Sequence, residues 1–506
     1  MTPTVSRAAV RGVYASYLNF AVGLLLSFGL TPIILSSLGP ADYGLWTIFT
    51  ALNGYFLLAD FGLTTSVMKY TAEYVATGKV ESLNRLLSAV MLVFVGASVL
   101  LFALALALVW VIPAWFGIEP SNAAVAQWSF LMIVASAALT LVVGALANVI
   151  SGHERIDAVK MTASVLMLVN AALSVAALRA GLGLIGLSAA MLFTSAAAIA
   201  LYGRFIRRAG WSVRFWPRRG DLSVLNAVWP YSLRTVGLGL TSRILYQTDS
   251  VVIGSFMGAP AVTPYAIAYK LCFTATYAFS QISSAMLPTF SRLSAIGARK
   301  ELAAAYLVIT RVSMGVMVPI AIGLGFLGQD FIEGWVGRDG VGPLPVLLLL
   351  VAMDFVHAVG TPAGLMLQGI GRNKAFIYAE TANAVLNLSL SLLLVRPLGT
   401  LGVAIGTLAA HLSTSAWVVP MLACRHVGLS GFVLVRRALI PPVAAGAPAL
   451  LVAWLSRELL AGAGFAGLAV RSALIALTYV GAYFCLPEAV EERAYAGRML
   501  RHRRPS

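Results

Sequence analysis

Residues 43–68 read YGLWTIFTALNGYFLLADFGLTTSVM, an apolar run in which Asp60 is the one charged residue. A helix needs about 20 such residues to cross the ~30 Å hydrocarbon core of a membrane. Similar runs recur along all 506 residues, of which 60% are hydrophobic and 11% charged. Soluble domains carry roughly 25% charged residues. The sequence therefore predicts an all-α polytopic membrane protein.

We expect about fourteen transmembrane helices, because apolar runs of spanning length alternate with short polar loops. The expected ranges are 14–38, 43–68, 86–113, 126–150, 157–178, 184–203, 224–255, 262–291, 304–328, 344–370, 375–395, 401–423, 438–456 and 465–486. The first run is too long for a signal peptide and lacks a clear cleavage site, so we interpret it as a spanning helix.

Lysine and arginine fall overwhelmingly on one side of this helix map. Outside the helices, the opposite side carries only Arg179, Arg338, Arg396 and Arg457. Cytoplasmic loops are enriched in these residues, so both termini are expected in the cytoplasm. The net charge of +16 then reflects topology and suits contact with membrane lipids, and we expect no nucleic-acid partner.

The chain also resembles itself at an offset of 217 residues. SGHERIDAVK (151–160) aligns with QGIGRNKAFI (368–377), and VNAALSVAALR (169–179) aligns with LNLSLSLLLVR (386–396). The repeat unit contains six helices, and an even number predicts parallel repeats about an axis normal to the membrane. We therefore expect two pseudo-symmetric six-helix lobes around a central cavity, plus two peripheral C-terminal helices.

This pattern divides the chain into five parts. They are an N-terminal lobe (1–208), a basic cytoplasmic linker (209–223), a C-terminal lobe (224–430), two additional helices (431–487) and a basic cytoplasmic tail (488–506). The linker is aromatic as well as basic, which is typical of an interfacial segment.

Several ionisable residues fall inside predicted helices, where each costs about 2.5–3.5 kcal/mol at the helix centre. They include Asp60, Asp249, Asp354, Glu380, Arg234, Arg243 and Lys270. Internal salt bridges that fix helix packing are one interpretation. As a group, these residues indicate the lining of a polar cavity.

The helix expected at 224–255 has the most polar face. At 100° per residue, Arg243 shares a stripe with Gln247, whereas Arg234 points to the opposite side. We therefore favour Arg243 as the cavity residue. A guanidinium binds phosphate in a bidentate manner, and Lys270 would add a point charge, so the pattern favours a phosphate-bearing substrate.

Asp354 and His357 lie three residues apart, on one face of the helix expected at 344–370. Such a pair could carry a proton. The simpler alternative is a histidine that is hydrogen-bonded within the helix bundle.

Signals for enzymatic chemistry are weak. Cys272, Cys424 and Cys485 are isolated, and the chain has neither a P-loop lysine motif nor an HExxH motif. Two GxGxxG matches, at 181–186 and 462–467, lie at helix ends without the βαβ unit that dinucleotide binding requires. We expect no metal, no cofactor and no enzymatic activity.

LGPADYGLWTIFTALNGYFLLADFGLTTSVMKYTAEY (38–74) resembles the N-terminal signature of bacterial lipid-linked oligosaccharide flippases. These are the O-antigen and exopolysaccharide translocases of the multidrug/oligosaccharidyl-lipid/polysaccharide exporter superfamily. DSVVIGSFMG (249–258), YAIAYKL (265–271), LPTFSRL (287–293) and QGIGRNK (368–374) are similar to the same family, so the resemblance covers about residues 1–430.

The resemblance implies a flippase of the bacterial inner membrane that moves an undecaprenyl-pyrophosphate-linked oligosaccharide to the periplasmic leaflet. Alternating access driven by an ion gradient is the implied mechanism, and polysaccharide polymerases and other assembly proteins are the implied partners. Matching positions carry over Asp60 and Asp249 as coupling or gating residues, a role we also expect for Asp354, His357 and Glu380.

Three alternatives remain. Lipid II flippases also have fourteen helices, but the arginine cluster of their first lobe has no match here. Multidrug extruders of the same fold often carry an acidic residue in the first helix, and 14–38 has none. A membrane-embedded polysaccharide polymerase or ligase would generally place its catalytic groups in a sizeable periplasmic loop. The longest outer loop expected here is only 328–343.

Overall fold

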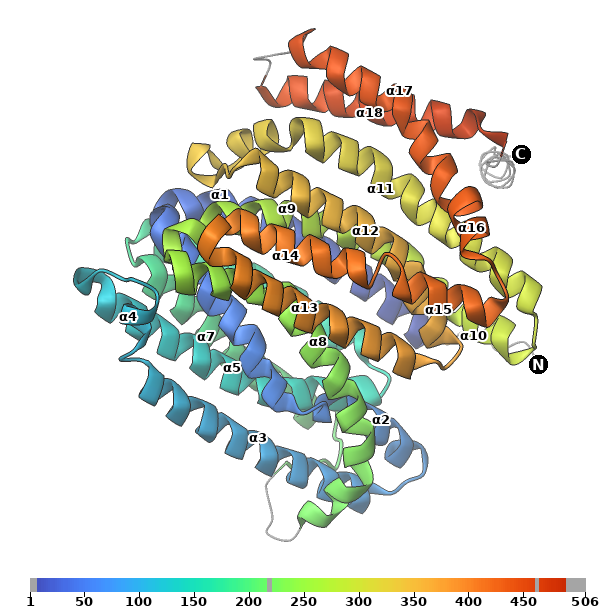
Figure 1. Cartoon of the computed structure of the whole chain (residues 1–506). Coiled ribbons are helices and arrows are strands. Elements are labelled where there is room, and N and C mark those ends of the chain that lie inside the picture. The colour runs from blue at the N-terminus through green and yellow to red at the C-terminus, as the bar shows by residue number, and fades with distance from the viewer. Residues whose placement is uncertain (1–6, 216–220, 460–463, 488–506) are drawn as a thin grey trace, which may run out of the picture. The chain divides into compact units, whose positions relative to one another are not determined.

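The computed structural model describes residues 7–215, 221–459 and 464–487, and within these ranges it contains helices, turns and loops but no strand. It comprises two compact units, Met1–Thr263 and Pro264–Ser506. Figure 1 shows the course of the helices within each. Every helical range expected from the sequence overlaps a helix of the structure.

The first unit is built from eight helices and the start of a ninth. They are α1 (Arg7–Phe56), α2 (Leu63–Ala76), α3 (Val80–Leu108), α4 (Ile112–Trp115), α5 (Ala123–Gly152), α6 (Ile156–Arg179), α7 (Gly183–Arg208) and α8 (Leu225–Met257), followed by α9 (Ala259–Ser284). The helix α8, which we expected to open the second lobe, packs against α1 and α2 of this unit.

The second unit continues from α9 to the C-terminal helices. They are α10 (Leu287–Ala295), α11 (Arg299–Val336), α12 (Leu344–Gly369), α13 (Asn373–Leu398), α14 (Thr400–Ser413), α15 (Val418–Val427), α16 (Gly431–Leu434), α17 (Ile440–Leu459) and α18 (Gly464–Cys485). The expected tail, 488–506, lies outside the described residues.

Eleven helical segments of the described chain are long and apolar enough to cross a membrane. The first of them, Tyr14–Asp60, contains the first expected helix and most of the second, because α1 continues through a kink at Gly39. The helices α8 and α9 are not among the eleven. The chain is a multi-pass membrane protein, and the number fourteen stays a prediction.

Four expected helices are interrupted, so their continuity was predicted wrongly: 43–68, 86–113, 262–291 and 401–423. The range 43–68 breaks after Phe56 into a short 3₁₀ turn, and Phe61 and Gly62 then adopt positive φ before α2 begins. The range 401–423 breaks between α14 and α15. Apolar periodicity identifies long helices, but it does not distinguish a continuous helix from one with a buried break.

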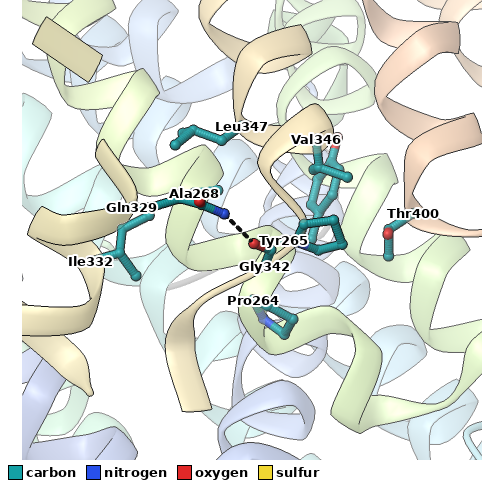
Figure 2. Close-up of a pocket in the computed structure, with 10 residues that line it drawn as sticks. Pro264, Tyr265, Ala268, Gln329, Ile332, Gly342, Val346, Leu347 and Thr400 are labelled. Atoms are coloured by element: carbon teal, nitrogen blue, oxygen red, sulfur yellow. Dashed lines mark hydrogen bonds between the residues drawn. The ribbon is translucent and has the colours of Figure 1, made fainter. Parts of the chain in front are cut away.

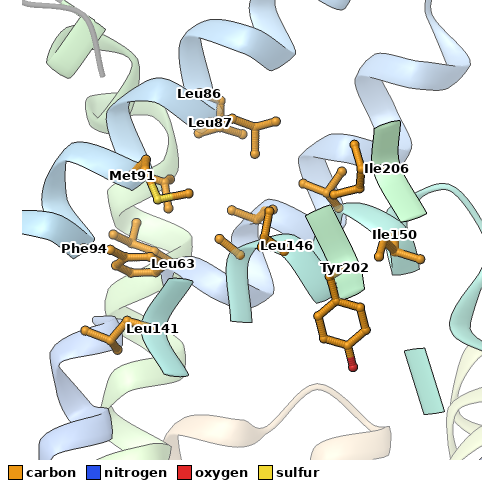
Figure 3. Packing of buried hydrophobic residues seen from close by; sticks show 14 of the residues in the cluster. Leu63, Leu86, Leu87, Met91, Phe94, Leu141, Leu146, Ile150, Tyr202 and Ile206 are labelled. Atoms are coloured by element: carbon orange, nitrogen blue, oxygen red, sulfur yellow. The ribbon is translucent and has the colours of Figure 1, made fainter. Parts of the chain in front are cut away.

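The core of the first unit lies where α2, α3, α5 and α7 meet. Figure 3 shows Leu63, Phe94 and Leu141 among the side chains of this cluster. Leu63 and Phe94 are completely buried, which is expected when an apolar face of each helix turns toward its neighbours.

The linker begins by packing on this first unit. The Trp211 ring stacks on His153 with the ring centroids 3.7 Å apart. Asn84 of α3 donates from Nδ2 to the Ser212 carbonyl at 3.1 Å and accepts from the Arg214 N–H at 2.7 Å. These contacts hold residues 211–214 in place, whereas 216–220 lie outside the described residues.

The second unit has two apolar cores. One joins α10, α11, α12, α13 and α15 around the fully buried Phe290 and Tyr306, and the other joins α11, α12, α17 and α18. The helices α17 and α18, which follow the predicted duplication, pack on α11. Arg471 of α18 donates to Asp330 of α11 at 3.3 Å.

The self-similarity of the sequence corresponds to matching local structure in the two units. The turn after α5 closes with the Arg155 N–H donating to the Ile150 carbonyl, and the turn after α12 closes with Arg372 donating to Leu367. Both bonds join residues that are five positions apart. Glu154 and Gly371, at equivalent positions of these turns, have φ of 60° and 77°.

Gly39 and Gly258 provide a second match. Their φ and ψ angles are 74° and 172° for Gly39, and 81° and 166° for Gly258. This region of backbone space is essentially restricted to glycine. Each glycine therefore allows a sharp change of direction, between the two halves of α1 and between α8 and α9.

Candidate functional site

In the first unit, the second half of α1 lies unusually close to α8 and the start of α9. A Cβ on Gly44 would lie 1.9 Å from the Ala259 carbonyl oxygen, and one on Gly254 would lie 2.5 Å from Ile48. Thr263 also donates to the Pro40 carbonyl at 2.6 Å. Small residues of this kind allow helix backbones to approach closely inside a membrane.

The same crossing brings together Arg243 and Gln247, the two residues predicted to share a polar stripe. With its amide oriented to satisfy both neighbours, Gln247 donates to the Ala51 carbonyl and accepts from the Arg243 Nη1 at 3.2 Å. Gly54 makes room for this amide, because a Cβ there would lie 1.8 Å from Gln247 Oε1. The contact between Arg243 and Gln247 was expected, and the role of Gly54 was not.

Tyr55 extends this polar crossing by one turn. Its hydroxyl shares a 2.5 Å hydrogen bond with Thr248 Oγ1. The next residue, Asp249, is only 4% exposed. A half-buried guanidinium, amide and phenol and a buried carboxylate are thus held on the α1–α8 crossing, where they can bind or position a charged ligand.

Asp60 lies at the break between α1 and α2, where its carboxylate accepts two hydrogen bonds. Thr64 donates from its backbone N–H to Oδ1 at 2.9 Å and from its hydroxyl to Oδ2 at 2.8 Å. A carboxylate at the start of a helix satisfies an otherwise unpaired N–H group and interacts favourably with the helix dipole. Asp60 therefore has a structural contact in addition to its predicted coupling role.

In the second unit, Asp354 is almost fully buried in α12 and accepts a 2.5 Å hydrogen bond from Thr276 of α9. Its second oxygen, Oδ2, is buried without a hydrogen-bond partner among the described residues. Asp354 and His357 lie one turn apart on α12 as predicted, but their identified partners differ.

His357 contacts His411 of α14, with the ring centroids 5.6 Å apart and the planes at 87°. His411 also lies within hydrogen-bond distance of Asn383 in α13. Sequence analysis missed His411 and Asn383, because they lie on different helices. The run HLSTS (411–415) concentrates polar residues inside an expected spanning helix and was a usable signal.

The remaining predicted site residues are placed as follows. Lys270 is half-buried in α9, and Glu380 is half-buried in α13, one turn before Asn383. Arg234 belongs to α8, but its side chain lies outside the described residues. Lys270 and Glu380 belong to the second unit, whereas Arg243 belongs to the first.

A small pocket opens at one end of the second unit. Figure 2 shows Pro264, Ala268, Ile332 and Leu347 lining it. Gln329 donates to the Gly342 carbonyl at 2.9 Å across it. Because its lining is almost entirely apolar and lacks a charged side chain, the pocket does not suit a glycan or a pyrophosphate.

Comparisons with solved structures place this helical architecture in a known fold. A lipid II flippase, MurJ, in an inward closed conformation, is 14% identical, with a TM-score of 0.72 over 96% of this chain and 100% of that chain. A multidrug resistance MATE family transporter in an inward-facing conformation is also 14% identical, with a TM-score of 0.66 over 84% and 98%. A MOP superfamily transporter from Pyrococcus furiosus is 15% identical, with a TM-score of 0.57 over 84% and 96%.

At these identities the similarity establishes the fold alone. No curated protein matches the sequence. A family model described as "Polysaccharide biosynthesis protein" matches residues 9–294, which is more than half of the chain and includes the whole α1–α8 crossing. The chain therefore belongs to the polysaccharide biosynthesis protein family and has the fold of the MOP superfamily, to which flippases and multidrug transporters belong.

Proposed function

We propose that this protein is a flippase that moves an undecaprenyl-pyrophosphate-linked oligosaccharide from the cytoplasmic to the periplasmic leaflet of the bacterial inner membrane. The observation that carries the proposal is the position of Arg243, at the α1–α8 crossing of a polysaccharide biosynthesis protein. A guanidinium is suited to a pyrophosphate group, because its fork of donors matches phosphate oxygens.

The contacts of Arg243 support this role. Of the five N–H donors on a guanidinium, Nη1 contacts Gln247 at 3.2 Å. Gln247 is itself fixed by Ala51 and by the space above Gly54. A positioned guanidinium pays less conformational entropy on binding than a mobile one. We assign Arg243 and Gln247 to the substrate, together with Arg234 and Lys270.

Alternating access between two six-helix lobes is the mechanism we propose, with both termini in the cytoplasm. Asp60, Asp249, Asp354, His357 and Glu380 are the proposed coupling and gating residues. Carboxylates and imidazoles inside a membrane protein commonly serve ion and proton pathways. Membrane lipids surround the protein, and a polysaccharide polymerase would receive the translocated glycan.

The test is transport of a fluorescent pyrophosphate-linked glycolipid in proteoliposomes, scored by its access to an outside quencher. We expect Arg243→Gln to slow transport about tenfold or more, since charged hydrogen bonds contribute about 1.5–3 kcal/mol. Arg338→Gln is the matched control, because that side chain is 90% exposed and pairs with Glu333. Equal transport by both variants and wild type would remove Arg243 from the substrate site.

The second candidate is a cation-coupled multidrug exporter, which the similarity to a MATE family transporter favours. An exporter of this kind would move a cationic dye in the same vesicles and leave the glycolipid in place.

A further inference from the structure

The helix that follows α13 is interrupted halfway along its length. The segment Thr400–Val427 is apolar enough to span a membrane. However, α14 ends at Ser413 and α15 begins only at Val418. Inside a membrane, such an interruption is tolerated where protein buries it or where it lines a cavity, and interrupted helices form ion sites in transporters.

The start of this interruption is buried, and its backbone packs against α12. Thr414 and Ser415 are 4% and 2% exposed. A Cβ on Gly360 would lie 2.8 Å from the Ser415 carbonyl oxygen. The glycine thus allows the broken backbone to lie directly on α12, one turn after His357.

His411 occupies the last turn before the interruption and is 3% exposed. Its Nδ1 lies 3.3 Å from Asn383 Nδ2 and 3.3 Å from Ser415 Oγ. An amide nitrogen only donates, so Nδ1 accepts in this arrangement and the ring proton is on Nε2. The structure therefore corresponds to the proton-free form of Nδ1.

Asn383 can also serve the protonated form. Its Oδ1 is buried without a hydrogen-bond partner among the described residues. An unpaired buried acceptor is costly, and it needs an explanation. If the amide rotates by 180°, Oδ1 faces His411 and accepts a hydrogen bond from a protonated Nδ1. Both protonation states of His411 then have a hydrogen-bond partner, and the orientation of the Asn383 amide differs between them.

The nearest charged and titratable groups lie on α12 and α13, which pack against α14, and α15 follows α14 in the chain. On α12 these are His357, whose ring contacts His411, and Asp354, one turn away and bonded to Thr276. On α13 it is Glu380, one turn before Asn383. Cys424 is the buried titratable group of α15. His357 is thus the immediate neighbour that can share a proton with His411.

We propose that His411 is a proton-binding site of the transport cycle, with Asn383 as an amide switch and His357 as its proton-sharing neighbour. The proton comes from water on one side of the membrane, binds Nδ1 of His411 and leaves to water on the other side. Exchange with water requires a conformation in which the buried interruption opens. This inference rests on the proposed function and adds the coupling ion.

The test measures how a pH gradient changes the steady-state distribution of the labelled glycolipid across proteoliposome membranes. For one proton per substrate, a gradient of one pH unit shifts that distribution about tenfold. We expect this shift for wild type and for the control His426→Gln, which lies outside the cluster. We expect no shift for His411→Gln. We also expect no shift for Asn383→Leu, which keeps the His411 imidazole but removes its amide partner.

The outcomes separate the two proposals. A wild type that equilibrates the glycolipid but ignores the pH gradient, or a His411→Gln variant that still responds tenfold, overturns the proton site and leaves the flippase in place. A wild type that moves no glycolipid overturns the proposed function.

The proton site is also tested without transport, by ¹⁵N NMR of histidine-labelled full-length protein in nanodiscs. We expect a protonated imidazole signal at low pH that His411→Gln removes and His426→Gln retains. Absence of such a signal overturns the proton site whatever the transport result.

Discussion

Asp60 has a structural contact as well as a proposed coupling role. Both of its carboxylate oxygens accept from Thr64, so it caps α2. Asparagine is also an effective cap, because its side-chain oxygen accepts the same backbone bond. Exchange of Asp60 for asparagine therefore removes the charge and preserves the cap, which allows the two roles to be measured separately.

We predict that Asp60→Asn folds with wild-type stability but loses most of its translocation. Asp60→Ala should in addition lower the unfolding free energy by about 1 kcal/mol, the typical loss on removing a cap. Thermal unfolding in detergent and the glycolipid assay measure the two effects. Normal transport by Asp60→Asn, together with destabilisation by Asp60→Ala, would reduce Asp60 to a structural cap.

Two glycines of α1 should respond differently to alanine. At Gly44 the new Cβ meets backbone, the Ala259 carbonyl, whereas at Gly54 it meets the end of the flexible Gln247 side chain. We predict that Gly44→Ala lowers the unfolding free energy by about 3 kcal/mol and Gly54→Ala by about 1 kcal/mol, within the range for overpacking.

Thermal unfolding compares these variants with Gly96→Ala. That glycine lies in α3 with nothing within 4 Å of its added Cβ, so alanine should stabilise the helix by about 0.5–1 kcal/mol. Equal stabilities for Gly44→Ala and Gly96→Ala would contradict the close approach of α1 to α9.

At the scale of elements, the Arg471–Asp330 pair joins α18 to α11. Arg471 is 4% exposed and the Asp330 side chain 59% exposed, while Arg471 Nε and Nη2 are buried without hydrogen-bond partners among the described residues. Removing one partner of a buried pair costs about 3–5 kcal/mol. The exposure of Asp330 reduces that cost, because water screens the charge.

We therefore predict that Asp330→Asn lowers the unfolding free energy by about 1–2 kcal/mol. Arg471→Met should cost less, because it leaves only an exposed carboxylate unpaired. A double-mutant cycle on thermal stability measures the coupling. Additive effects of the two substitutions would show that the pair does not attach α18 to α11.

The first residues of the linker give a prediction at the same scale. Trp211→Ala removes the stack on His153 and should loosen the backbone around Arg214, whose side chain is already exposed. We expect cleavage after Arg214 to become several-fold faster in limited proteolysis, because local opening governs such cleavage. Trp128→Ala, at a 60% exposed position, should cleave at the wild-type rate. An unchanged rate in Trp211→Ala would show that the stack does not hold the linker.

For the whole molecule, the sequence predicted the long helices because apolar runs of spanning length dominate the chain. The offset between the repeats was also readable, since the loop residues Arg155 and Arg372 recur in equivalent turns. The hydropathy of the sequence did not predict the break at Asp60 or the interruption after His411. The first break holds one charged residue in an apolar run, and the second is a short segment of mostly small residues that packs on α12. Hydropathy registers neither break.

The candidate site was predictable only within single helices. Arg243 and Gln247 were expected to share a helix face, because they lie four residues apart on α8. The contact of His411 with Asn383 joins two helices, and Gly54 matters because of a side chain nearly 200 positions away. Such contacts depend on helix rotation and crossing, which one sequence does not specify.

The measurement that tests the central claim most directly offers two substrates to the same proteoliposomes. One is a fluorescent pyrophosphate-linked glycolipid, and the other is a cationic dye. The account predicts that wild-type protein moves the glycolipid between leaflets, that Arg243→Gln slows this movement and that the dye distribution does not change. Gradient-driven efflux of the dye with no movement of the glycolipid would contradict it and identify a drug exporter.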